Sequence, residues 1–104
     1  NQADRWGKTA LHKAVSSRQL DVCRLLLSHG SNPNGQDMDI VSPGRTPLFE
    51  AADAGHLDLC RLLVNAGARV TATDADRLTP LHVAAQERFP LVCQFLIDRG
   101  ADVR

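Results

Sequence analysis

Apolar residues gather in six short segments of the chain, and these segments come in three pairs. In the first segment of the third pair, Leu81, Ala84 and Ala85 stand at positions i, i+3 and i+4, which places them on one face of a helix. A Thr-Pro pair precedes them. The threonine hydroxyl can cap free amides, and proline fits the first helical position because its missing N–H is not needed there. The pattern therefore predicts a helix over residues 80–87.

The second segment of each pair ends at a glycine. In the third pair, Val92, Phe95 and Leu96 form one apolar face, and Gly100 can adopt the left-handed conformation that closes a helix. This pattern predicts a helix over residues 90–99. The same reasoning predicts four further helices, over residues 10–17, 20–29, 47–54 and 57–66.

Each predicted pair of helices has too little apolar surface to fold alone. Helices of this length are marginal in water, and one pair cannot offset the conformational entropy that is lost when it is ordered. We therefore expect the three pairs to stack on one another. Leu62, in the second helix of the middle pair, is expected to lie on the packed face.

Three sets of equivalent residues share one spacing. Thr9, Thr46 and Thr79 are separated by 37 and 33 residues, and the three cysteines and three of the glycines keep the same intervals. The threonines open the sequences Thr-Ala-Leu-His-Lys-Ala-Val, Thr-Pro-Leu-Phe-Glu-Ala-Ala and Thr-Pro-Leu-His-Val-Ala-Ala. A period near 33 with this core is typical of a helix-pair solenoid. Over almost its whole length the chain resembles the ankyrin repeat family.

This resemblance implies an all-α fold, an ankyrin-repeat solenoid of three stacked helix pairs with β-hairpin-like finger loops. In this family the fingers and first helices line a concave surface, and the second helices form the convex back. The resemblance assigns one domain over residues 1–104. Repeat 1 covers about 4–36, repeat 2 about 37–73 with a finger lengthened at 35–44, and repeat 3 about 74–104.

Composition narrows the classes of partner. Twelve basic and twelve acidic residues cancel, which gives no electrostatic reason to expect nucleic acid or an anionic membrane as the main partner. No apolar run approaches the roughly 20 residues that span a bilayer. Equivalent cysteines in stacked repeats should lie roughly 8 to 10 Å apart, whereas a disulfide needs Cα atoms within about 7 Å. We expect reduced, buried thiols and an intracellular protein, in the cytoplasm or the nucleus.

The residues that could be mistaken for a catalytic or metal site are spread through the repeat. His12 and His82 lie inside the repeated motif, where the family uses the ring in the hydrogen bonds of the turn, and Phe49 fills the same position in the second copy. The cysteines belong to the second helices and the motif histidines to the first, so no Cys-His catalytic pair is expected. The cysteines also lack the spacing of zinc ligands, which come in pairs two to four residues apart. We therefore expect no enzyme activity, no metal and no cofactor.

Arginines replace glycine at two kinds of turn. Arg18 and Arg88 stand where the middle copy has Gly55, at a position that favours positive φ and costs a non-glycine residue about 1 kcal/mol. Arg77 likewise replaces the glycine found at Gly44. These arginines are either strained surface residues or side chains that reach a partner.

Candidate binding residues come from the long finger, the first helices and the N-terminal segment. The segment from Gly30 to Thr46 is four residues longer than its counterpart, and its apolar tip either contacts another protein or folds back on the adjacent repeat. Trp6 lies between Arg5 and Lys8, which suits a binding hot spot, or else it covers the open end of the stack. The full candidate set is Arg5, Trp6, Lys8, Lys13, Met38, Asp39, Ile40, Val41, Arg45, Glu50, Asp53, Asp76, Gln86 and Glu87.

Charge also changes along the stack. Residues 1–35 carry five basic and two acidic side chains, a net charge of +3, whereas residues 36–104 carry seven and ten, a net charge of −3. The family resemblance implies a non-catalytic module that binds a protein or peptide, as a scaffold or adaptor. The alternatives are the substrate-recognition segment of a ubiquitin-ligase adaptor and a purely structural spacer. Because the outer repeats keep the full apolar pattern, we also expect flanking repeats or a capping element.

Overall fold

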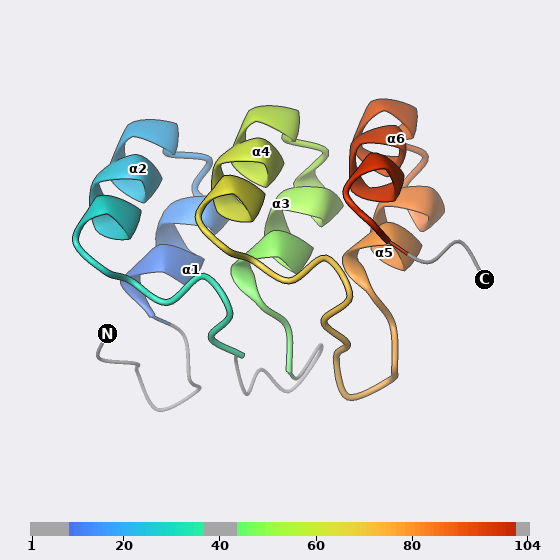
Figure 1. Ribbon diagram of the computed structural model, residues 1–104, viewed down its shortest axis with the longest axis horizontal. Coiled ribbons are helices and arrows are strands. Elements are labelled where there is room, and N and C mark those ends of the chain that lie inside the picture. Colours follow the sequence, from blue (N-terminus) through green and yellow to red (C-terminus); the bar gives the residue numbers. More distant parts are fainter. Residues whose placement is uncertain (1–8, 37–43, 102–104) are drawn as a thin grey trace.

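The computed structural model describes residues 9–36 and 44–101 of the 104-residue chain. Six helices follow one another there and no strand is present among these residues (Figure 1). None of the helices in this part has the length and apolar character that a membrane crossing requires. The helices are α1 (Ala10–Ser16), α2 (Leu20–Ser28), α3 (Pro47–Ala54), α4 (Leu57–Asn65), α5 (Pro80–Gln86) and α6 (Pro90–Asp98).

The repeated threonine motif explains where the first helices begin. In α1, Thr9 Oγ1 accepts a hydrogen bond from the backbone N–H of His12, and His12 Nδ1 accepts one from the Thr9 N–H at 3.1 Å. Thr79 and His82 form the same reciprocal pair at the start of α5. The motif histidines therefore have the structural role that the sequence predicted.

The helix ends lie within one residue of their predicted positions. α3 ends at Gly55, which has a left-handed φ of 69°. At the equivalent turns, Arg18 and Arg88 have φ values of 56° and 62°, so the expectation of positive φ at these two arginines is confirmed. We call positions equivalent when the repeat spacings of 37 and 33 residues relate them.

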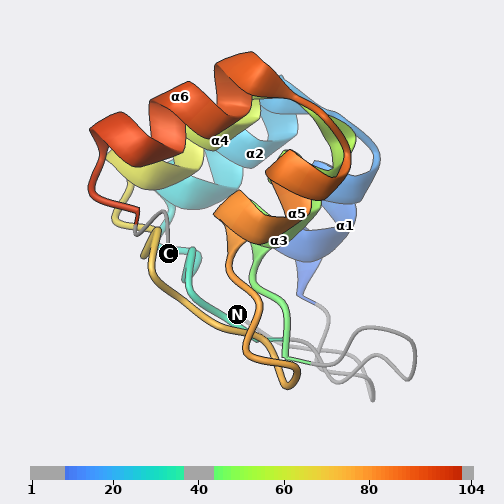
Figure 2. The ribbon, with the colours of Figure 1, turned by 90° about the vertical axis from the view of Figure 1, so that its right-hand side faces the viewer.

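The helices form two layers (Figure 2). The first helices, α1, α3 and α5, lie side by side in one layer, and the second helices, α2, α4 and α6, lie in the other. The core fills the space between the layers and between successive pairs. Its fully buried members include Leu11, Val15, Cys23, Leu48, Ala52, Leu59, Cys60, Leu63 and Leu96.

The middle repeat corrects one sequence-based expectation. Leu63 of α4 is fully buried, whereas Leu62, the residue expected at the packed face, is only half-buried at its edge. Neighbouring leucines point about 100° apart on a helix, so sequence alone leaves open which of the two faces the core. In the structure, packing between the two helix layers buries Leu63 and leaves Leu62 at the edge of the core.

The three cysteines are free, as predicted. Cys23 and Cys60 are fully buried, and burial raises the pKa of both thiols, that of Cys60 from 9.0 to about 12. Cys93 is only partly buried, because no helix pair in the described part of the chain covers its side of α6. The expectation of buried thiols therefore holds for two of the three copies.

Replacing Leu63 with alanine should lower the free energy of unfolding by about 2 to 5 kcal/mol, because a fully enclosed site cannot collapse around the lost methyl groups. The matched variant is Leu62→Ala, which should cost less since Leu62 already contacts solvent. Chemical denaturation of both variants measures the difference. Equal losses would show that the two leucines share the core.

Alkaline pH should destabilise the fold through Cys60. A thiol whose pKa is higher in the folded protein than in the unfolded chain favours folding below pH 9, and this contribution is lost as the pH rises toward 12. Over that interval the loss is about 1.4 kcal/mol per pH unit. Denaturation at pH 8, 10 and 11 should show a shallower decline for Cys60→Ala than for the unaltered protein. Parallel declines would contradict the assignment.

Candidate protein-binding surface

The outward side of the first helices carries a row of polar side chains. Lys13 on α1, Asp53 on α3 and Gln86 on α5 are exposed, Glu50 is half-buried, and Glu87 is exposed at the C-cap of α5. We call these five residues the first-helix face. Its single lysine lies in the first repeat, and its carboxylates lie in the second and third.

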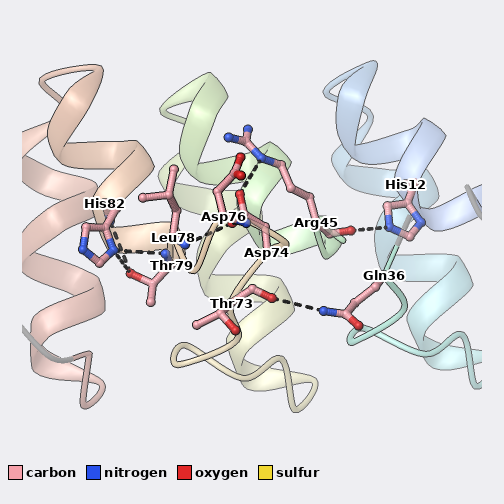
Figure 3. Close-up of polar contacts among 9 residues, drawn as sticks. All are labelled: His12, Gln36, Arg45, Thr73, Asp74, Asp76, Leu78, Thr79 and His82. Carbon is pink, nitrogen blue, oxygen red and sulfur yellow. Dashed lines mark hydrogen bonds and ion pairs between the residues drawn. The ribbon is translucent and has the colours of Figure 1, made fainter. Parts of the chain in front are cut away.

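Side-chain amides tie the loop after α2 to the loop after α4. Asn34 Nδ2 donates to the Gly67 carbonyl at 3.1 Å, and Asn34 Oδ1 accepts from the Arg69 N–H at 2.8 Å. Gln36 Nε2 donates to the Thr73 carbonyl at 3.1 Å (Figure 3). These bonds hold the two loops in register.

Asp74 organises the loop between α4 and α5. Its Oδ1 accepts from the backbone N–H groups of Asp76 and Leu78, at 2.9 and 3.0 Å. Its Oδ2 lies 3.5 Å from Arg45 Nε, an ion-pair distance at which the angles do not make a hydrogen bond (Figure 3). The Arg45 guanidinium also lies over the Phe49 ring, 5.6 Å from its centroid. Arg45 thus joins its own loop to the next one.

The finger loops are described only in part. The Asp74 N–H donates to the Leu78 carbonyl at 2.9 Å, which is a bond of the hairpin type. No strand is present in the described residues, so the β-hairpin-like form of the fingers stays a prediction.

A polar cleft of about 330 Å³ lies between the two tied loops. Asn34, Thr46, Arg69 and Thr73 are among the residues that line it. Thr46 Oγ1 is buried and has no hydrogen-bond partner. Phe49 occupies the place of the motif histidine and has no ring nitrogen for the hydroxyl to bond, and its backbone N–H donates to the Thr46 carbonyl at 3.0 Å rather than to the hydroxyl. Of the three first helices, α3 alone lacks a side-chain cap.

The sequence left open whether the arginines at positive φ are strained surface residues or side chains that reach a partner. The Arg18 guanidinium donates to the Ala54 carbonyl at 3.3 Å, where α3 ends. Arg18 therefore reaches the neighbouring repeat. Arg77 has a φ of 66°, comparable with 81° at Gly44, the equivalent turn of the preceding loop.

Seven of the candidate residues lie outside the described part of the chain, namely Arg5, Trp6, Lys8, Met38, Asp39, Ile40 and Val41. The other seven divide into two groups. Lys13, Glu50, Asp53, Gln86 and Glu87 form the first-helix face, whereas Arg45 and Asp76 belong to the loops. Their part in binding stays a prediction.

Sequence reasoning missed Asn34, Gln36 and Asp74. One pattern could have pointed to Asp74, because it stands five residues before Thr79 just as Asp4 stands five before Thr9. Asn34 and Gln36 have no such pattern, since their partners are backbone groups that only the stacking brings close. Within residues 9–36 and 44–101, no group of three or more histidine, cysteine or acidic side chains could hold a metal ion.

Comparison with known proteins gives two family matches, which together span residues 6–104. A family model of ankyrin repeats in three copies matches residues 34–104, and a model of the single ankyrin repeat matches residues 6–38. The chain is also 42% identical over 40 residues to the 2-5A-dependent ribonuclease of Mus musculus. This match covers 38% of the chain and 5% of that ribonuclease, so the enzyme's activity is not carried over.

The family models account for features seen independently in the structure. They span the repeated Thr-Pro-Leu motif, the three stacked helix pairs and the turns that join them. The three-copy model alone covers more than half of the chain. The chain therefore belongs to the ankyrin repeat family.

Proposed function

We propose that this chain is a non-catalytic module that binds a protein or peptide through its concave first-helix face and finger loops. Ankyrin repeats are generally protein–protein interaction modules. The observation that supports a binding role for these elements here is the set of bonds from Asn34 and Gln36, which fix neighbouring loops beside the first-helix face.

Fixed loops favour binding for an entropic reason. Each flexible side chain or loop that must be ordered at an interface costs free energy, so a surface ordered beforehand leaves more of the contact energy as affinity. The Arg45–Asp74 ion pair supports this order, because Asp74 is only 7% exposed and Arg45 joins it from the preceding loop. The loops thus present backbone and side-chain groups in one arrangement.

Charge supplies the orientation of the proposed partner. Lys13 lies at the first repeat, and Asp53 and Glu87 lie at the second and third, all on exposed positions. A partner segment with acidic residues at one end and basic residues at the other would be complementary to this face. Neither nucleic acid nor a membrane is the proposed partner. Free cysteines favour the cytoplasm or nucleus as the location.

Two alternatives lead to different outcomes in cells. As the substrate-recognition segment of a ubiquitin-ligase adaptor, the same face would bind a protein whose ubiquitylation depends on it. As a structural spacer, the face would bind nothing, and the repeats would only hold neighbouring domains apart.

The test compares two triple variants. The first variant replaces three residues of the first-helix face with serine, namely Lys13, Asp53 and Gln86. The matched control replaces three exposed residues of the second helices with serine, namely Arg24, Arg61 and Gln94. Quantitative crosslinking in cells should show about a ten-fold loss of bound partners for the first variant, the size expected when a central contact is removed.

The second-helix variant should keep its partners, and circular dichroism should show that both variants retain their helices. Ubiquitylation of a captured partner that disappears with the first-helix variant would identify the adaptor alternative. Full retention of every partner by both variants would contradict binding through the first-helix face and favour the spacer.

A further inference from the structure

The middle repeat departs from the other two at two positions that affect one cleft. Phe49 replaces the motif histidine, and Arg69 stands where the first repeat has Asn32 and the third has Asp102. Thr46 and Arg69 both line the polar cleft between the two tied loops. The two departures therefore change the same site, because one leaves a hydroxyl without its usual partner and the other adds a positive charge.

Thr46 is the buried residue of the cleft wall, with 2% of its surface exposed. Its hydroxyl has no hydrogen-bond partner in the described part of the chain. In the first and third repeats the equivalent hydroxyls, of Thr9 and Thr79, accept from the backbone N–H of the motif histidine. A buried polar group without a partner is destabilising, so an occupant of the cleft that supplies an acceptor would satisfy it.

Arg69 supplies the only charge among the described residues that line the cleft. Its backbone N–H is bonded to Asn34, but within residues 9–36 and 44–101 its guanidinium has neither a hydrogen bond nor an ion pair. Thr71 and Thr73 add two exposed hydroxyls that can also donate. A guanidinium beside several hydroxyls favours an anionic oxygen group as the occupant.

The neighbouring charges limit how much negative charge fits. Asp74 follows Thr73 directly, and its buried carboxylate pairs with Arg45, the residue before Thr46. This pair is neutral as a whole, which leaves the single positive charge of Arg69. A carboxylate matches that charge, whereas a phosphate carries up to two negative charges and would be repelled by Asp74.

The cleft has the size of a side chain rather than of a large ligand. Its volume of about 330 Å³ lies near the lower end of the range of small-molecule pockets. The bonds from Asn34 and Gln36 hold its two walls together (Figure 3). Arg69, Thr71 and Thr73 are exposed, so the cleft is open to solvent. A side chain that projects from a partner protein can therefore enter a site that is already formed.

We propose that the cleft between the two tied loops binds the carboxylate of an aspartate or glutamate side chain of a partner protein. Arg69 donates to this carboxylate through its guanidinium, and Thr46 donates through its hydroxyl after a rotation about its Cα–Cβ bond. The inference rests on the proposed function only for the source of the carboxylate, because the first-helix face contributes no residue to the cleft.

The direct test uses N-acetylglutamic acid α-methylamide as the probe, which carries one side-chain carboxylate and needs no partner protein. Titration into the full chain at constant ionic strength should give saturable changes in the amide NMR shifts of Thr71, Ala72 and Thr73. The matched glutamine compound should give none. Absence of saturable changes with the glutamate probe would overturn the proposal without affecting the crosslinking test of the first-helix face.

Two substitutions test the assigned donors. Arg69→Gln and Thr46→Val should each weaken probe binding about ten-fold, since each removes a hydrogen bond to a charged group. The matched control is Arg61→Gln, an exposed arginine of α4 outside the cleft, and it should leave the affinity unchanged. A loss with Arg69→Gln but not with Thr46→Val would indicate attraction to a surface arginine alone and would overturn the site.

Unfolding of the free protein separates a role in binding from a role in the fold. Thr46→Val should not raise the unfolding constant, because its hydroxyl has no partner to lose. Thr79→Val is the matched variant, since it removes a hydroxyl that accepts from the His82 N–H, and it should raise the constant about five-fold. An equal rise for both variants would show that the Thr46 hydroxyl is already bonded within the fold, which contradicts its role as a donor.

Two further arms identify the ligand and its source. Inorganic phosphate should bind more weakly than the glutamate probe, and tighter binding of phosphate would overturn the assignment to a carboxylate. In cells, Arg69→Gln should lower the crosslinking yield of the partner about ten-fold, as it does the affinity for the probe. Full partner yield from a variant that no longer binds the probe would show that the carboxylate does not come from the partner.

Discussion

Burial of each helix pair against the next is the interaction on which the rest of this structure depends. The helices are seven to nine residues long, too short to be stable alone, and their small apolar faces become a core only when they stack. Ala51 and Ala52 show how this is achieved, because their short side chains are fully buried and allow neighbouring first helices to approach closely. The helix caps, turns and loops add to a structure whose core is formed by this stacking.

Polar groups fix the register of the stack. The threonine–histidine pair caps its own helix through Nδ1, and in the first repeat it also reaches the next one through Nε2. Where Phe49 replaces the histidine, the second bond is lost and Thr46 Oγ1 is left without a partner. The middle repeat is compensated by tighter apolar contact, since Phe49 is fully buried and Gly55 admits the ring of Phe89. Variation between copies thus changes how each interface is joined.

The same stacking creates the surface proposed for binding. Loops that leave successive second helices run beside one another, so that Asn34 can bridge two peptide groups of the next loop and Arg45 can pair with Asp74. Such cross-loop bonds order the loops before any partner arrives. The proposed functions of the first-helix face and of the cleft between the two tied loops therefore use different parts of one array.

The sequence by itself determined the six helices to within a residue, the capping threonines of α1 and α5, the positive φ of the turn arginines and the free thiols. All of these follow from local chemistry repeated at a fixed spacing. Only the tertiary structure decided that Leu63 is buried rather than Leu62, that Asn34 and Asp74 join neighbouring loops, and that Arg18 bonds to Ala54 while Cys93 stays partly open. Each of these depends on which neighbour lies alongside, and that is set by packing between segments more than 30 residues apart.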